Sequence, residues 1–376
     1  MDFHYVVIPA LIVLTGGFVG WLSIRRFLSL QRRSYPSWRK VTERIAFSGI
    51  ALTALAVAAS SGFNAIALHA NKLPGETYSV NGHKMRIDCT GSGSPTILLE
   101  AGAGNDGLIW GGVQPVLAKT TRVCSYDRAG FGGSEALPPP RDADHIAGEL
   151  HGLLVAAKLD GPIVLMGHSL GGIFIRDYAT RYPKAIAGLI FVDSATPLQQ
   201  RDPAFRAFDA QEHQGQTGML LNKAVFALGI PRLIGACSAS RSELNSGFDA
   251  HAAELLAEDR CHEPFATIAG EAENLDRSGE ETLHTGPYGA MPILIFSHDV
   301  AVDAAHGRPA DLAAAFSQMQ EDLKKLSTRS RRVIAKGSGH YIQLDRPELI
   351  EREASLFIGE FRGVATGQQS SGSTTE

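Results

Sequence analysis

The chain has 376 residues, of which 44% are hydrophobic, 20% charged and 7% aromatic. This composition is that of a globular protein and excludes a collagen-like, disordered or disulfide-dense chain. The net charge of −4 at pH 7 gives no basic field for a nucleic-acid backbone, so we expect no nucleic-acid partner. The charge is unevenly distributed: residues 1–72 carry a net +6, from eight basic and two acidic side chains, and the remainder a net −10, from 27 and 37.

Two long uncharged segments lie in the basic N-terminal part. Residues 3–24 form the first, and at 1.5 Å per residue a helix of this length covers about 33 Å, enough for a hydrocarbon core of roughly 30 Å. Residues 45–68 form the second, which is richer in Ala and less apolar. We therefore predict a hairpin of two transmembrane helices within residues 1–72, with the lipid bilayer as partner.

The loop between the two segments is strongly basic. Short loops with an excess of Lys and Arg stay in the cytoplasm, which predicts a multi-pass protein of the cell membrane whose remaining chain lies on the extracytoplasmic side. The alternative is that the second segment is the core of a signal peptide behind its basic region. The basic residues are Arg25, Arg26, Arg32, Arg33, Arg39, Lys40 and Arg44.

Beyond a short linker at residues 71–76, apolar strand-like runs alternate with helical patterns. Each run has four to seven mostly apolar residues and ends in Gly, Ser, Asp or His, which is typical of buried parallel strands. This alternation predicts an α/β fold whose polar groups gather where the strands end. The predicted strands lie in residues 96–102, 121–127, 162–169, 187–194, 291–298 and 331–340, and the predicted helices in 144–158, 171–182 and 311–326.

About a hundred residues separate two of these strands. A connection of this length must carry structure of its own, so we predict a helical lid at about residues 197–288. The polar tail at residues 363–376 is predicted to be disordered. The soluble domain is thus expected to span residues 76–362.

The sharpest chemical signal is the pentapeptide Gly-His-Ser-Leu-Gly at residues 167–171. It follows a predicted strand and opens a predicted helix, and in that context G-x-S-x-G places a nucleophilic serine on a tight turn where glycines relieve crowding. Ser169 is therefore the candidate nucleophile. A bare glycine-rich helix start is the alternative reading of the same letters.

A serine hydroxyl needs a general base at neutral pH, and His340 is the candidate. It lies just past the last predicted strand, before a helix whose start is marked by Asp345 and Pro347. The acid that orients it has two candidates: Asp193 follows one strand end and Asp299 the next, with Asp303 further along.

The developing oxyanion also needs amide donors. We expect the N–H of Leu170, the residue after the nucleophile, and that of Ala103 in the glycine-rich turn after the strand at residues 96–99.

Four motifs in this order resemble the serine-hydrolase branch of the alpha/beta-hydrolase fold superfamily. They are GHSLGG, the EAGAG turn at residues 100–104, YDRAGFGGS at 126–134 and GSGHYIQLDRPELI at 337–350. The resemblance covers about residues 76–362 and not the membrane hairpin. It implies an eight-stranded, mostly parallel sheet, a lid after the sixth strand, and a Ser, acid, His order along the chain.

Two departures from the family pattern bear on the site. The usual His-Gly of the oxyanion turn is replaced by Glu100-Ala101-Gly102, and the usual Gly-x-x-Asp after the seventh strand by Ser297-His298-Asp299. The second departure displaces the acid by one residue. It therefore favours Asp193, as in family members that take the acid from the sixth strand, with Asp299 as the alternative.

The expected function is that of a membrane-anchored serine hydrolase that cleaves small or lipid-like carboxylic esters through an acyl-enzyme. A serine at position 169 disfavours dehalogenase and epoxide hydrolase chemistry, which would use Asp. Thioesterase, peptidase, C–C hydrolase, acyltransferase and perhydrolase chemistry use the same residues and stay open. A non-catalytic ligand receptor is the alternative from another class.

The chain has four cysteines and no metal-binding spacing such as CxxC or HExxH, so we expect neither a metal nor a cofactor. In an oxidising compartment the cysteines can pair. In the fold that the motifs imply, Cys89 and Cys124 lie on neighbouring strands and Cys237 and Cys261 share the lid. We predict these two disulfides, with four free thiols as the alternative. The oligomeric state is left open.

Overall fold

The computed structural model describes residues 3–29, 36–70, 72–197, 199–207, 225–226, 230–234, 236, 248, 250–259 and 264–370. The chain divides into two compact units. The larger contains residues 73–214, 242–256 and 264–376 and holds the whole sheet. The smaller contains residues 1–72, 215–241 and 257–263. The predicted boundary after residue 72 thus coincides with a boundary between the units.

The larger unit is built on one eight-stranded sheet in the order β1-β2-β4-β3-β5-β6-β7-β8. β2 is antiparallel to β1 and β4, and the other neighbouring pairs are parallel. The prediction of an α/β fold with a mostly parallel, eight-stranded sheet is therefore confirmed. The strands are β1 Glu76–Val80, β2 His83–Thr90, β3 Thr96–Glu100, β4 Val123–Tyr126, β5 Ile163–His168, β6 Ile186–Val192, β7 Ile293–His298 and β8 Ser330–Ala335.

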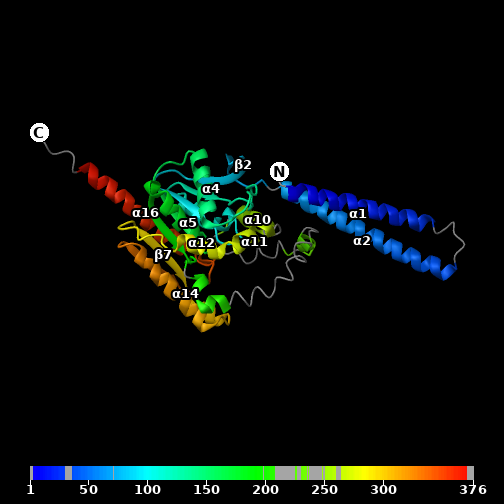
Figure 1. The fold of residues 1–376 in the computed structure, drawn as a ribbon. Helices are drawn as coiled ribbons and strands as arrows, with labels where there is room; N and C mark the ends of the chain where they lie inside the picture. The colour runs from blue at the N-terminus through cyan, green and yellow to red at the C-terminus, as the bar shows by residue number, and fades with distance from the viewer. Residues whose placement is uncertain are drawn as a thin grey trace. The chain divides into compact units, whose positions relative to one another are not determined.

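Helices cover both faces of this sheet (Figure 1). Because successive strand residues point to opposite faces, Ile97 and Leu99 pack with α16 on one face while Leu98 packs with α4 and α5 on the other. Both faces are buried, which explains the continuous apolar runs in the sequence. The helices are α3 Gln114–Leu117, α4 Ala143–Ala156, α5 Gly171–Arg181, α13 Val300–Ala305, α14 Ala310–Asp322, α15 Ile342–Asp345 and α16 Pro347–Ser370, and the short 3₁₀ helices are η2 Gly107–Trp110, η3 Pro183–Ala185, η4 Gln199–Arg201 and η7 Leu323–Leu326.

The long connection between β6 and β7 contains several described helices. Its helices are α8 Ile230–Leu233, α10 Ala250–Asp259, α11 Phe265–Glu273 and α12 Leu275–Thr282. In the larger unit, α12 packs against α4 and α5. α11 lies over the loops after β3 and β4, since a side chain at Gly104 would touch Ile268 and one at Gly130 would collide with Thr267.

The last helix corrects one prediction. α16 continues to Ser370, so residues 363–370 are helical rather than disordered, and residues 371–376 lie outside the described part. The stretch after Arg362 has no proline, and the helix that begins at Pro347 continues through Gly363 and Gly367.

In the smaller unit, α1 (Phe3–Ser29) and α2 (Ser37–Ala70) lie side by side (Figure 1). Their close contact uses small residues, because a Cβ at Gly16 would come within 2.8 Å of the Ala54 carbonyl oxygen. Within the described residues, one segment has the length and composition to cross a membrane, Ser37–Ser60 of α2, with a mean hydropathy of 1.5. The prediction of two spans is thus supported for one helix, and the other span stays a prediction.

A disulfide joins Cys89 of β2 to Cys124 of β4, which lie directly opposite each other in the antiparallel register. The other predicted pair, Cys237 and Cys261, lies outside the described residues.

We expect the Cys89→Ala/Cys124→Ala variant to be less stable than the wild type by about 3 to 4 kcal/mol, because the bridge closes a loop of 35 residues in the unfolded chain. Urea unfolding of the full chain in detergent, with and without reductant, measures this difference. Reductant should lower the urea unfolding midpoint of the wild type by breaking this bridge. The double variant lacks the bridge and should not show that part of the shift. Equal unfolding midpoints for the two proteins without reductant would contradict the expectation.

Candidate active site

Ser169 lies on a tight turn between β5 and α5. Its backbone has φ of +51°, a left-handed conformation that costs a non-glycine residue free energy. The flanking glycines are required by space, since a Cβ at Gly167 would lie 2.7 Å from the Gly171 carbonyl oxygen and one at Gly171 would lie 2.7 Å from that of Ala101. The sequence therefore folds here into the strained strand-to-helix turn that presents a nucleophile above a sheet.

Asp193 occupies the corresponding position on the neighbouring strand. His168 pairs with Val192 in the parallel register of β5 and β6, so Ser169 and Asp193 both follow the paired residues, and the Ser169 N–H donates to the Val192 carbonyl at 3.2 Å. Asp193 is fully buried and also left-handed, with φ of +47°. The turn aims its carboxylate across the end of β7 toward the loop after β8.

His340 comes to this carboxylate from that loop, between β8 and α15. Its Nδ1 lies 2.6 Å from Oδ2 of Asp193, which leaves Nε2 available to a substrate or nucleophile. The backbone of His340 is held as well, because its carbonyl oxygen lies 3.1 Å from Nε2 of His168. Burial lowers the pKa of His168 to about 3, so this imidazole is neutral and donates its Nε2 hydrogen to the carbonyl.

The other acid candidates lie elsewhere. Asp299 caps α13, where its carboxylate accepts the N–H of Ala301 at 3.2 Å and that of Gly337 at 3.1 Å. Asp303 lies one turn into α13 and contacts His298 at 2.6 Å. The carboxylate that contacts His340 is that of Asp193.

Asp193 accepts from two imidazoles. His298 approaches with its backbone N–H at 2.8 Å from Oδ1 and with Nδ1 at 2.9 Å from both carboxylate oxygens. Burial alone would raise the pKa of Asp193, but hydrogen bonds from His298 and His340 hold it below its usual range. Asp193 is therefore an anion at any physiological pH.

The hydroxyl of Ser169 makes no hydrogen bond in the described part of the chain. The serine and His340 lie in the same small region, because the rings of His168 and His340 have centroids 4.7 Å apart. Catalytic hydrogen bonds of this kind are often long before substrate binds. Proton transfer from Ser169 to Nε2 of His340 therefore stays a prediction.

The turn after β3 lies against the candidate nucleophile. A Cβ at Gly102 would be 3.0 Å from Cβ of Ser169, so only glycine fits between them. Within the described residues, neither the N–H of Ala103 nor that of Leu170 donates to another group of the protein. Both predicted oxyanion donors are therefore free to receive a ligand oxygen.

Arg128 holds this turn from behind. Its guanidinium donates to the carbonyl oxygens of Ala101 and Gly102 at 2.8 and 2.9 Å and pairs with the carboxylates of Glu100 and Glu271. Glu271 belongs to α11, so the same guanidinium fixes the inserted helix to the oxyanion turn. Burial raises the pKa of Glu100 to about 7, although Arg128 and Tyr126 favour the anion.

Sequence reasoning assigned no role to Arg128, Glu271 or His298, and it considered Asp303 only as an acid candidate. Arg128 lies in the motif YDRAGFGGS, and His298 lies in Ser297-His298-Asp299, which replaces the usual Gly-x-x-Asp. Both positions could therefore have been noticed in the sequence, whereas Glu271 lies in no such motif. No group of three or more His, Cys, Asp or Glu side chains is arranged to hold a metal ion among the described residues.

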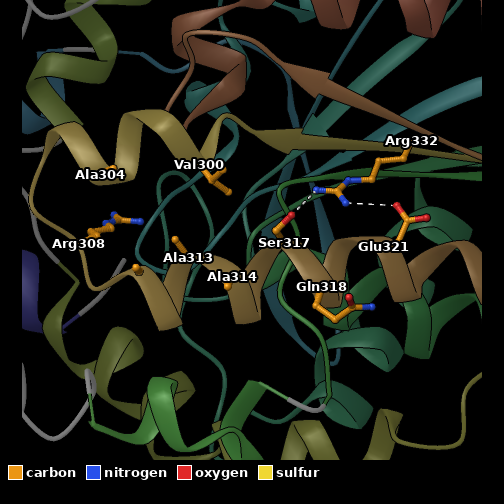
Figure 2. Close-up of a pocket in the computed structure, with 10 residues that line it drawn as sticks. Val300, Ala304, Arg308, Ala313, Ala314, Ser317, Gln318, Glu321 and Arg332 are labelled. Carbon is orange, nitrogen blue, oxygen red and sulfur yellow. Dashed lines mark hydrogen bonds and ion pairs between the residues drawn. The ribbon is translucent and has the colours of Figure 1, made fainter.

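A cavity of about 510 Å³ opens between α13, α14 and β8 (Figure 2). Its wall contains several alanines, Arg308, and Arg332, which bonds to Ser317 and Glu321. Ser169, Asp193 and His340 do not line it, so it is separate from the candidate catalytic centre. Arg308 connects the two regions, because it pairs with Asp303 at 3.2 Å.

The profile of the Alpha/beta hydrolase family matches residues 97–353. The chain belongs to this family. This hydrolase is 28% identical over 300 residues to a Hormonema carpetanum protein named "Probable transporter efuK", covering 73% of this chain and 41% of that protein. It is 27% identical over 289 residues to an "AB hydrolase superfamily protein" of Gibberella zeae, covering 70% and 86%.

Solved structures agree on the fold. A thermophilic esterase from Thermogutta terrifontis matches with a TM-score of 0.54 and 22% identity, over 76% of this hydrolase and 98% of that chain. An epoxide hydrolase matches with a TM-score of 0.55 and 17% identity, over 76% and 98%. At these identities the likeness establishes the shared fold, and the chemistry must be argued from this chain's own residues.

The Glu100→Gln variant should lose less stability than the wild type as the pH rises from 5 to 8. Folding raises the pKa of Glu100 to about 7 from 4.5 in the unfolded chain. The contribution of Glu100 to the free energy of unfolding is therefore complete below pH 4.5 and is lost as the pH rises through 7. Glutamine bonds the same partners without titrating. We expect the wild type to lose roughly 2 to 3 kcal/mol more than the variant over this range.

Urea unfolding at pH 5, 6.5 and 8 measures the effect. Glu273→Gln, an exposed change on the same helix as Glu271, is the control and should follow the wild type. A Glu100→Gln protein that loses as much stability as the wild type would show that Glu100 does not titrate in this way.

Proposed function

We propose that this hydrolase is a membrane-tethered serine esterase that cleaves carboxylic esters, including lipid-like ones. Ser169 attacks the ester carbonyl while Nε2 of His340 accepts the proton of the serine hydroxyl. The N–H groups of Leu170 and Ala103 donate hydrogen bonds to the oxyanion that forms. His340 then protonates the leaving alcohol. A water activated by the same imidazole hydrolyses the acyl-enzyme and regenerates Ser169.

The contact between Nδ1 of His340 and the buried Asp193 carboxylate, at 2.6 Å, carries this proposal. A carboxylate at Nδ1 fixes the tautomer with a bare Nε2 and stabilises the imidazolium that forms when the serine proton is taken. The strained turn at Ser169 and the free amides of the oxyanion turn supply the other two parts. A purely structural histidine would not require all three at one edge of the sheet.

Serine at the nucleophile position separates this proposal from other chemistry on the same fold. Dehalogenases and epoxide hydrolases form an alkyl-enzyme ester through an aspartate, which this chain lacks at position 169. An ester carbonyl is the electrophile that suits a serine with an oxyanion hole. An amphiphilic ester fits an enzyme that lies at a membrane.

Three observations support a tethered, extracytoplasmic enzyme. Large apolar side chains are exposed along both α1 and α2, among them Leu14, Phe18, Ile45 and Leu52. The loop between the helices is basic, which favours its retention in the cytoplasm. The Cys89–Cys124 disulfide suits an oxidising compartment. We therefore propose two spans, with the hydrolase domain outside the cytoplasm.

A fluorophosphonate probe should label the wild type and fail to label Ser169→Ala, because the probe forms a covalent bond with an activated serine. Asp193→Asn should lower kcat for p-nitrophenyl esters by about 10³ to 10⁴-fold through loss of the correct tautomer. Asp299→Asn is the matched control and should lower it by less than about threefold, since Asp299 caps a helix. A folded but unlabelled wild type would favour a receptor, and equal losses in the two Asp variants would remove Asp193 from its role.

The preference of the enzyme for acyl-chain length is measured with a panel of substrates rather than with variants. Rates on p-nitrophenyl esters of increasing chain length distinguish a small-ester enzyme from one that acts on lipid-like esters. Rising kcat/KM with chain length would support the lipid-like class, and a fall beyond the shortest esters would exclude it.

The topology predicts that a C-terminal tag is protected from protease in intact cells and cut after the outer barrier is opened. Two spans with a basic cytoplasmic loop place both ends of the chain outside the cytoplasm. A tag inserted instead within the loop at residues 30–35 is the matched control and should stay protected in both states. A C-terminal tag that survives in spheroplasts would overturn the orientation.

A further inference from the structure

A second histidine stands behind the acid of the candidate catalytic centre. Nδ1 of His298 faces both carboxylate oxygens of Asp193 at 2.9 Å, and its Nε2 faces Oδ2 of Asp303 at 2.6 Å. All three side chains are buried. The chain of contacts therefore runs from Asp303 through His298 and Asp193 to His340.

The geometry assigns a charge to His298. A neutral imidazole has one N–H, so one of its nitrogens would present a lone pair to a carboxylate, which is repulsive at these distances. An imidazolium donates to both carboxylates at once. Burial disfavours that cation, but the hydrogen bonds and charges of Asp193 and Asp303 outweigh it and raise the pKa of His298 to about 9.

Two imidazoles therefore compete for one proton beside Asp193. Among the described residues, His340 contacts one carboxylate, whereas His298 contacts two. The second acceptor therefore favours the charge on His298. With the proton on His298, a further proton on His340 would place two cations around one carboxylate. A general base must be neutral to accept the proton of the serine.

We propose that His298 and Asp303 form a positioning pair that holds the shared proton away from His340, so that the base stays neutral in mildly acidic surroundings. This inference rests on the proposed function, since it concerns how His340 serves as base. It deepens that function by predicting that the enzyme stays active at a pH at which an isolated Ser-His-Asp site would be protonated.

The other charged and titratable groups nearby do not supply the same effect. Asp299 pairs with backbone N–H groups, and Lys336 lies 3.8 Å from it. His168 is neutral because burial lowers its pKa to about 3. Phe316 of α14 contacts the rings of both His298 and His340 and carries no charge. Among the described residues, Asp193 after β6 contacts His298, and Arg308 after α13 pairs with Asp303 at 3.2 Å. Arg332 of β8 donates to Ser297, the residue before His298, and pairs with Glu321 of α14. His340 and Tyr341 lie in the loop after β8, where their rings contact each other.

The test uses the full chain in detergent and compares Asp303→Asn with the wild type. Asparagine keeps the size of the side chain and an oxygen acceptor for Nε2, so this variant preserves the packing and removes the charge. The proton then divides between the two imidazoles, and the acidic limb of the kcat/KM profile should move upward by about one pH unit. Asp311→Asn, an exposed change at the start of α14, is the charge control and should leave the profile unmoved.

His298→Gln provides the second variant, with His306→Gln, an exposed histidine at the end of α13, as its control. Removing the competing ring should move the limb in the same upward direction. A purely structural role would lower kcat or the unfolding midpoint and leave the limb in place. An unmoved limb, or one that moves downward, in folded and active Asp303→Asn would overturn the proposal.

Histidine NMR separates this inference from the proposed function. In protein labelled at the histidine Cε1 carbon, the His298 signal should report a charged ring from pH 5 to 8, and the His340 signal should titrate at higher pH in Asp303→Asn than in the wild type. These signals are read without turnover. If the wild type does not label with fluorophosphonate, the proposed function fails. A neutral His298 at pH 6, or a His340 titration that Asp303→Asn leaves unchanged, overturns the positioning pair in either case.

Discussion

One buried carboxylate organises the candidate centre. Asp193 is fully buried and would be costly as an anion without partners, yet it accepts hydrogen bonds from the two imidazoles and from a backbone N–H. Its partners come from β7 and from the loop after β8, so one carboxylate bonds groups at the ends of three neighbouring strands. The position of His340 depends on this carboxylate.

A second buried charge, the guanidinium of Arg128, is likewise offset by partners of opposite charge near the candidate nucleophile. Arg128 is enclosed between Glu100 and Glu271, and its remaining hydrogens support the carbonyl oxygens of the oxyanion turn. A guanidinium suits this place because its planar fork can donate to several acceptors at once. The turn that is predicted to receive the oxyanion is thus held by the same guanidinium that pairs with Glu271 of α11. Arg128 therefore joins the inserted segment to this turn.

The helical pair α1 and α2 and the hydrolase domain place their apolar side chains differently. α1 and α2 expose large apolar side chains and contact each other through glycine and alanine, as helices do when lipid surrounds them. The sheet of the hydrolase domain buries apolar residues on both faces and keeps its polar groups for the strand ends.

The sequence by itself determined the features that depend on near neighbours. The turn at Ser169 needs only a strand, two glycines and a helix, all within residues 163–181, and the apolar runs of β3 to β7 record burial on both faces directly. The polar composition of residues 363–376 predicts disorder, whereas α16 continues to Ser370.

Only the tertiary structure shows that Asp193, and not Asp299, contacts His340. Both follow a strand end, and their difference lies in the direction of the turn: φ of +47° sends Asp193 toward His340, 147 residues away, while Asp299 caps its own helix. The partners of Arg128 and the second imidazole at Asp193 were hidden for the same reason. Arg128 and Glu271 are 143 residues apart, and His298 and Asp193 are 105 apart. Such pairings are fixed by how strands are ordered in the sheet, and no local pattern of residues records that order.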